Sequence, residues 1–332
     1  MRFPVSRRVL LTTGVSGASL ALLTACGLRL DADPELPTLD SSQRLRNRIA
    51  RILASTTPGS GDPDTAGEDL DDFVTAIGPV WNPPTELATE PPPSEDERSF
   101  LEAAEVVSRV VFDAAPELGS GLIPVLTDVA TGLTLTAGTK EPELIRTADE
   151  LIRAGREEGS DAAGTASAGH GSRRPKAPED RQSMFNAILN QSRAAAYGYE
   201  RLAVNFARKS AERTGALARL ESLGSLSGEM LELLGEDNAD PNASAWQLDP
   251  TPTDTRTARE LALGLEDGLA AALLPWLESE TSAILRLWES ARARTVFSQP
   301  QPLRFTYSGS GRAGSAEARA SAPTATPAGV AG

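Results

Sequence analysis

The chain has 332 residues, a net charge of −14, one cysteine (Cys26) and one histidine (His170). A chain this acidic repels the phosphates of nucleic acids, so we expect no nucleic-acid partner. One cysteine excludes an internal disulfide, and the two counts together exclude zinc sites built from cysteine and histidine.

Residues 1–26 have the pattern of an export signal. Arg2, Arg7 and Arg8 form a basic start, and a moderately apolar segment follows at 9–22. That segment is too short and too rich in threonine, serine and glycine for a stable transmembrane helix. We therefore interpret residues 1–26 as a signal peptide.

The end of this segment carries a second motif, Leu23-Thr24-Ala25-Cys26. It resembles the lipobox of bacterial lipoproteins, in which the cysteine thiol receives a diacylglycerol and becomes the new N-terminus. The resemblance implies a lipid anchor on Cys26, with the body of the protein on the extracytoplasmic face of the membrane.

The basic start also resembles a twin-arginine export signal, which carries folded proteins. The residues concerned are Ser6-Arg7-Arg8-Val9-Leu10-Leu11. The family pattern usually has phenylalanine at the position of Leu10, but the weakly hydrophobic segment suits this route. General secretory export is the alternative.

The mature chain divides by composition into folded and irregular parts. We predict a polar tether at 27–40, an N-terminal helical unit at 41–157, a linker at 158–180, a helical bundle at 181–298 and a disordered tail at 299–332. His170 falls in the linker, where it has no partner nearby in sequence.

Capping patterns place the helices of the N-terminal unit. Asp40 with Gln43, and Ser94 with Glu97, each predict a helix start, and Pro142 predicts another near its first turn. Residues 56–68 and 79–93 are rich in loop formers. The run at 131–136 has strand propensity but no strand to pair with.

Residues 181–298 show four helical stripes of apolar residues joined by short connections, which predicts an antiparallel four-helix bundle. Gly235 closes the second helix. Thr257 with Glu260 resembles a capping box for the third, and Pro275 predicts a kink or restart. The predicted fold class is all-α.

Within this segment, several motifs resemble a ferritin-like family of actinobacterial proteins of unknown function, whose members often carry a lipoprotein signal. The motifs are Ala194-Ala195-Ala196-Tyr197-Gly198-Tyr199, Trp246-Gln247-Leu248-Asp249-Pro250, Ala258-Arg259-Glu260-Leu261-Ala262 and Leu265-Glu266-Asp267-Gly268-Leu269-Ala270-Ala271. The resemblance covers about residues 181–298 and implies a ferritin-like four-helix bundle.

The chain departs from that family where metal chemistry would begin. Ser192-Arg193 stand where family members commonly have a Glu-His pair, and the bundle contains no Glu-x-x-His motif. Because a di-iron carboxylate site needs two such motifs, we expect no metal and no cofactor.

No catalytic constellation is found, so we expect a non-enzymatic protein. A serine-histidine-aspartate triad would need His170, and Cys26 is committed to the lipid. Phosphate-binding glycine motifs are missing. Carboxylates remain, and we interpret most as a solvated, ion-paired face: Glu200, Glu221, Glu229, Glu232, Glu260, Glu266, Asp267 and Glu278.

A few residues of the bundle carry individual predictions. Glu266 and Asp267 interrupt an apolar helix and form an acid pair that could point inward. Tyr197 and Tyr199 point to different sides of one helix, so one is expected in the core with its hydroxyl bonded. Trp276 and Trp288 are interpreted as core or interface residues, and Trp246 as a cap on the bundle end.

Three functions stay open at this point. The first is a non-catalytic binding or structural lipoprotein that recognises a protein or another component of the cell envelope. The second is a lipid or small-molecule carrier with an apolar pocket between the two helical units. The third is a ferritin-like metal protein that uses carboxylates alone.

Overall fold

A computed structural model describes residues 39–82, 93–119, 121–163, 178–277, 282–297, 305–308 and 315–318. The predicted signal peptide with Cys26, nearly all of the tether and most of the linker with His170 lie outside these residues. The chain divides into two units, and one of them, Leu39–Trp81 with Pro93–Gly332, holds every helix and strand described. No helix within the described ranges is long and apolar enough to span a membrane.

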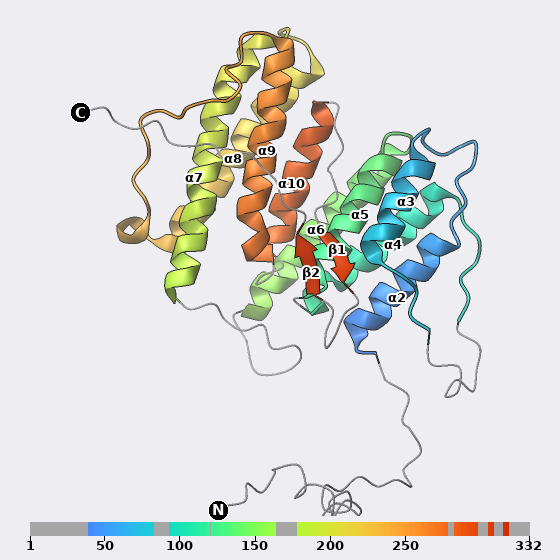
Figure 1. Ribbon diagram of the computed structural model, residues 1–332. Coiled ribbons are helices and arrows are strands. Elements are labelled where there is room, and N and C mark those ends of the chain that lie inside the picture. Colours follow the sequence, from blue (N-terminus) through green and yellow to red (C-terminus); the bar gives the residue numbers. More distant parts are fainter. Residues whose placement is uncertain are drawn as a thin grey trace, which may run out of the picture. The chain divides into compact units, whose positions relative to one another are not determined.

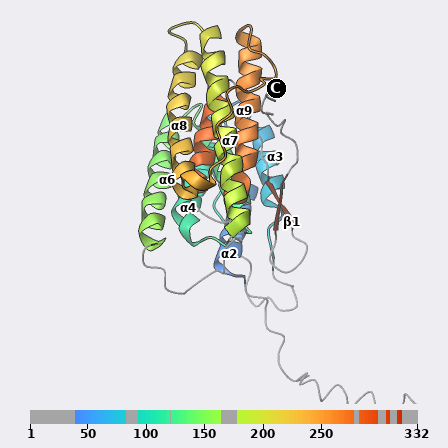
Figure 2. The ribbon, with the colours of Figure 1, turned by 90° about the vertical axis from the view of Figure 1, so that its left-hand side faces the viewer.

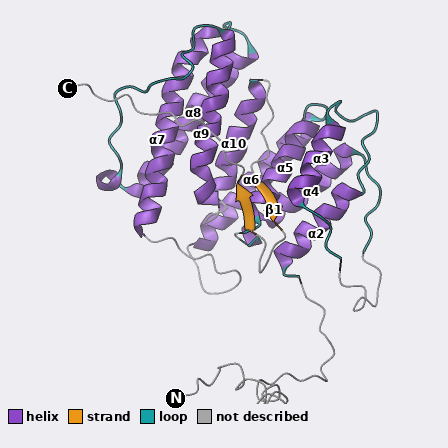
Figure 3. Ribbon diagram, viewed as in Figure 1, coloured by secondary structure: helices purple, strands orange, loops and turns teal. Residues whose placement is uncertain are grey.

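The described chain is mostly helical, which confirms the all-α prediction (Figures 1 and 3). Its α-helices are α2 (Ser41–Ala54), α3 (Ala66–Ile77), α4 (Phe100–Ala114), α5 (Ile123–Ala137), α6 (Pro142–Ala163), α7 (Pro178–Leu202), α8 (Ala211–Leu234), α9 (Thr255–Leu277) and α10 (Ala283–Val296). Three short 3₁₀ segments lie at Ala115–Glu117, Ala203–Asn205 and Glu236–Asn238, and the two strands are β1 (Phe305–Ser308) and β2 (Ser315–Ala318).

The last four helices pack as a ring. Helix α7 contacts α8 and α9, and α10 contacts the same two helices (Figure 2). Gly235, in the left-handed φ region at +73°, ends α8 as its position in the sequence predicts. Near one end of the bundle, Phe185 of α7 packs edge-on against Trp276 of α9, with 5.8 Å between the centroids of the two aromatic rings. This arrangement matches the helix count predicted for 181–298.

The N-terminal helices are built around α5. It contacts α3, α4 and α6, and also α9 and α10 of the four-helix ring. Every residue of α5 is buried, as expected for a helix that is apolar on all sides. The segment 131–136, with its strand propensity, lies inside this helix. The hydroxyl of Thr134 bonds within the helix, to Ala130 O at 2.6 Å, and also contacts Ser108 Oγ on α4.

One of the two capping patterns predicted for the N-terminal helices is confirmed, and the other is wrong. Asp40 does cap α2, because its carboxylate accepts a bond from Gln43 N at 2.7 Å. The predicted start at Ser94 and Glu97 is wrong. A second Ser-x-x-Glu pattern five residues later forms the capping box, with Ser99 bonded to Glu102. The earlier pattern cannot act as a cap, since Glu95 lies against Arg48, Arg51 and Arg98 in an extended segment.

The third helix of the ring is also capped differently. Asp254 accepts bonds from Thr257 N at 2.7 Å and from Thr257 Oγ1 at 2.8 Å, so the capping box predicted from Thr257 and Glu260 is wrong. An aspartate three residues earlier is an equally good cap. The helix continues past Pro275 to Leu277, so the chain does not restart at the proline.

The loop and tail predictions also need correction. Helix α3 begins at Ala66, inside the predicted loop 56–68. The tail prediction is wrong at residues 305–308 and 315–318, where β1 and β2 pair antiparallel with Phe305 opposite Ala318. Sequence composition missed β1 because its anchors lie far away in the chain.

Strand β1 is fixed to the N-terminal helices by two side chains. Phe305 is buried, and its backbone N–H donates to Asp128 Oδ2 at 3.2 Å. The ring of Tyr307 lies 4.1 Å from the guanidinium carbon of Arg46, which itself donates to Ile77 O at 2.8 Å. Gly78 sits beneath this stack with φ +74° and ψ 179°, a combination that is essentially restricted to glycine.

Replacing Gly78 by alanine should destabilise the fold. A Cβ there would lie 2.9 Å from Tyr307 Cδ1 and 3.0 Å from Arg46 Nη2, in a backbone conformation that side chains rarely adopt. We expect the free energy of unfolding to fall by about 1–3 kcal/mol in urea denaturation. The control is Gly224→Ala on α8, where nothing lies within 4 Å of the new Cβ. It should stabilise by about 0.5–1 kcal/mol. Equal effects of the two substitutions would contradict this assignment.

Candidate functional site

The core of the four-helix ring contains a complete ion pair. Glu266 on α9 is fully buried, and Arg219 on α8 is 5% exposed. Arg219 Nε donates to Glu266 Oε1 at 2.9 Å, and Arg219 Nη2 donates to Glu266 Oε2 at 2.8 Å. This two-pronged geometry matches the planar guanidinium to the carboxylate, which is the arrangement that tolerates burial best.

Tyr199 on α7 completes the pair. Its hydroxyl donates to Glu266 Oε1 at 2.7 Å. Burial and the charge of Glu266 raise the pKa of Tyr199 well above its usual value, so the hydroxyl stays a donor. Burial alone would lower the pKa of Arg219, but the charge and hydrogen bonds of Glu266, with the charges of Tyr199 and Glu289, together outweigh it and the pKa is raised. Both groups therefore keep the protonation state that the carboxylate requires.

The ion pair continues outward as a chain of polar contacts. Arg219 Nη1 donates to Ser222 Oγ at 3.0 Å, and Ser222 Oγ donates to Glu289 Oε2 on α10 at 2.8 Å. Arg286 Nη1 also donates to Glu289 Oε2, at 3.0 Å. Arg286 then reaches back to α8, where its Nε donates to Glu229 Oε2 at 2.9 Å.

The same chain extends to helix α6. Arg156 Nη2 donates to Glu229 Oε1 at 2.9 Å. Asp149 lies seven residues before Arg156 on α6. It accepts from Trp288 Nε1 at 2.6 Å and from Arg292 Nη1 at 2.5 Å, and both of these residues are on α10. Hydrogen bonds and ion pairs between charged side chains therefore link helices α6, α8, α9 and α10.

A groove of about 410 Å³ lies over this network. Its walls come from three helices, α6, α8 and α10. The lining residues are Asp149, Arg153, Gly215, Ala218, Arg219, Ser222, Glu289, Arg292, Ala293 and Val296. The volume falls in the range of small-molecule sites, about 300–1,000 Å³.

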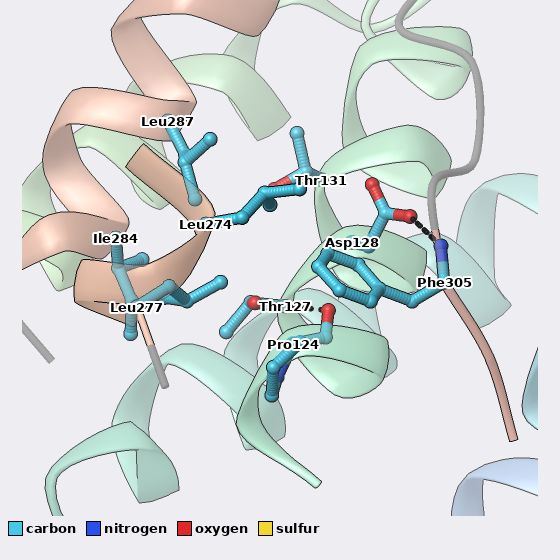
Figure 4. Close-up of a pocket in the computed structure, with 9 residues that line it drawn as sticks. All are labelled: Pro124, Thr127, Asp128, Thr131, Leu274, Leu277, Ile284, Leu287 and Phe305. Carbon is cyan, nitrogen blue, oxygen red and sulfur yellow. Dashed lines mark hydrogen bonds between the residues drawn. The ribbon is translucent and has the colours of Figure 1, made fainter. Parts of the chain in front are cut away.

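A second recess, between α5 and the helices α9 and α10, is much smaller. It is lined on one side by α5, including Thr127 and Thr131, and on the other by leucines and an isoleucine of α9 and α10, and Phe305 closes it (Figure 4). It holds about 10 Å³, and so does another recess beside Phe112 and Pro116. Each has room for about one water molecule.

The residues predicted from sequence are distributed as follows. Glu266 points inward, as its place in an apolar helix suggested, while Asp267 is 27% exposed and pairs with Arg294. Tyr199 is the buried tyrosine, and the half-buried Tyr197 lies 4.9 Å from the guanidinium carbon of Arg201. Both predictions about the tyrosine pair are thereby confirmed.

Most other carboxylates of the bundle lie at its surface. Glu200, Glu221, Glu232 and Glu260 are exposed, and Glu229 is partly buried between two arginines. Glu278 lies outside the described residues. Trp276 and Trp288 are in the core, as predicted, and Trp246 is 9% exposed.

No group of three or more histidine, cysteine, aspartate or glutamate side chains suited to a metal ion is found within the described ranges. The inward carboxylate of Glu266 already accepts three hydrogen bonds, two of them from Arg219. Its negative charge is therefore balanced by a guanidinium.

The buried arginines were not predicted from sequence, although the signal was present. Arg219 lies in the buried stripe of α8, with Ala216, Leu223, Leu226 and Met230 at helical spacing around it. Arg286 and Arg294 are likewise buried on α10. A charged residue inside an apolar stripe indicates a buried partner, and Glu266 is the matching residue on α9.

No family model matches the chain, and no curated protein or solved structure matches it. A function must therefore be inferred from the chain's own residues.

Replacing one partner of the buried ion pair should lower the stability far more than replacing both. Arg219→Met or Glu266→Leu alone leaves one buried charge unpaired, so we expect each to lower the free energy of unfolding by about 3–5 kcal/mol. The double substitution should cost less than either single one. Urea denaturation of all three variants gives the comparison.

The matched control is the exposed pair Arg256 and Glu260 on α9. Arg256→Met should change the stability by less than about 0.5 kcal/mol, because surface pairs contribute little. A cost under about 1 kcal/mol for either buried single substitution would contradict the role given to this pair.

Proposed function

We propose that this protein is a non-catalytic, lipid-anchored binding protein of the cell envelope, held on the extracytoplasmic face of the membrane by Cys26. The lipobox Leu23-Thr24-Ala25-Cys26 behind the arginine pair Arg7 and Arg8 supports the anchor. Acyl chains contribute about 0.8 kcal/mol per buried CH₂, so two chains hold an acidic body that anionic headgroups would repel.

The observation that carries the binding function is the groove between α6, α8 and α10. It holds about 410 Å³, and its walls belong to helices that are fastened by the charged network. A recess on rigid helices keeps its shape without its ligand, which lowers the cost of binding. We infer that a component of the cell envelope occupies it.

The lining favours binding over catalysis. The hydroxyl of Ser222 donates to Glu289 and accepts from Arg219, so it is held as a structural link. Asp149 and Glu289 each accept from an arginine, so both carboxylates take part in the charged network. Among the described residues, the lining contains no cysteine, histidine, lysine or tyrosine and no serine other than Ser222.

The carrier and metal alternatives that the sequence left open stand differently. The apolar recess between α5 and the helices α9 and α10 holds about 10 Å³, too little for a carried lipid. The groove of about 410 Å³ also lies between α6 of the N-terminal unit and the bundle, so it supports the small-molecule alternative. Glu266 is neutralised by Arg219, which leaves a carboxylate metal site without its inward acid. The ring of α7 to α10 and the motifs around Tyr199 support a ferritin-like origin of the fold, which we propose together with the loss of ferritin chemistry.

The anchor predicts a lipid on one residue. In a bacterium that processes lipoproteins, the full chain should incorporate an alkyne-tagged palmitate and partition into detergent. Cys26→Ser should abolish both. Arg7→Lys with Arg8→Lys should retain the precursor inside the cell while leaving Cys26 intact. Labelling that survives in Cys26→Ser would contradict the anchor.

The groove predicts a bound molecule that one substitution displaces. Ala218 is exposed and lines the groove, so Ala218→Trp should fill the space without disturbing the core. Native mass spectrometry of the protein taken from membranes should show an adduct in the wild type that falls at least tenfold in this variant. Glu232→Trp, exposed on the same helix but outside the groove, should keep it. No adduct, or an equal amount in both variants, would contradict the proposed site.

A further inference from the structure

We propose that the ligand of the groove is an organic anion, whose oxyanion group binds Arg153 and Arg292 and whose apolar part lies on α8 and α10. This inference rests on the groove being the binding site. It adds the chemical class of the ligand, which the shape of the groove alone does not give.

Both acidic groups of the groove are paired with arginines. Both oxygens of Asp149 accept bonds, from Trp288 and from Arg292. Glu289 accepts from Ser222 and Arg286, and Arg219 Nη1 lies 3.9 Å from the same oxygen. A cationic ligand would have to compete with arginines that are fixed in place, so the groove is a poor site for cations.

The groove is lined by three arginines and only two acidic residues. Arg153 is exposed at the groove, and it has no acidic partner in the described part of the chain. Arg292 is 43% exposed and gives one Nη1 bond to Asp149. A guanidinium binds carboxylate, phosphate and sulfonate oxygens through paired N–H groups, and Arg153 is available to do so. The net charge of the chain is −14, so Arg153 provides a local positive charge on a protein that is acidic as a whole.

Apart from Ser222, the remaining lining of the groove is apolar. Gly215 brings α8 close to α10, since a Cβ there would lie 2.6 Å from Val296 Cγ1. Ala218 and Ala293 continue this surface beside it. Small side chains leave room for a ligand and offer it no hydrogen bonds. The site therefore suits a molecule with an apolar body and one anionic group.

A pair of fluorescent probes tests the ligand class. The anion 8-anilino-1-naphthalenesulfonate and the neutral N-phenyl-1-naphthylamine share a ring system and differ by the sulfonate. We expect the lipidated full chain, in detergent, to bind the anion at least tenfold more tightly than the neutral probe. Arg153→Gln should weaken the anion about tenfold and leave the neutral probe unchanged, because it removes one charged hydrogen-bonding partner.

The control is Arg146→Gln on the same helix, at an exposed arginine that pairs with Glu143 outside the groove. It should leave both affinities unchanged. Ala218→Trp should weaken both probes if they bind in the groove. If Ala218→Trp abolishes the binding of both probes while Arg153→Gln changes neither affinity, the anion inference is overturned and the groove remains the binding site. If Ala218→Trp leaves the affinity for the anionic probe unchanged, the inference is overturned, and the result also counts against the groove as the binding site.

Discussion

The ion pair between Arg219 and Glu266 is the interaction on which the rest of the bundle depends. It joins α8 to α9 inside the core, and Tyr199 adds α7 through its hydroxyl. From Arg219 the contacts pass through Ser222 to α10, and Arg292 links that helix to Asp149 of α6. Because a buried charge without a partner is costly, these helices must keep their register. The groove inherits its shape from this constraint, since its walls are the same three outer helices.

The sequence predicted the helical class and the four helices of the ring, because apolar residues recur there at helical spacing. It failed where two signals of equal strength compete, as at Ser94 and Ser99, which both begin a Ser-x-x-Glu pattern. Glu95 pairs with Arg48 and Arg51 of α2 as well as with the neighbouring Arg98, and the approach of α2 is a tertiary contact that local spacing does not reveal. Strand β1 was missed for the same reason, since Arg46 and Asp128 hold it from far along the chain.

The candidate site was only half visible beforehand. Glu266 could be singled out as an acid in an apolar helix, and Arg219 occupies the matching position in the stripe of α8. The groove itself depends on how α6, α8 and α10 meet, and Asp149 and Arg153 come from a segment more than 60 residues before Gly215. Residue spacing along one helix cannot predict such a meeting. The buried guanidinium gives the inward carboxylate of Glu266 a positive partner within the bundle.

Side-chain NMR can show whether the groove binds an organic anion through Arg153. With arginine labelled by ¹⁵N, the Nε–Hε resonance of each guanidinium can be followed while 8-anilino-1-naphthalenesulfonate is added. We expect a saturable shift at Arg153 and a smaller one at Arg292, with Arg146 unchanged. Saturation of the probe fluorescence with no shift at Arg153, or with an equal shift at Arg146, would contradict it.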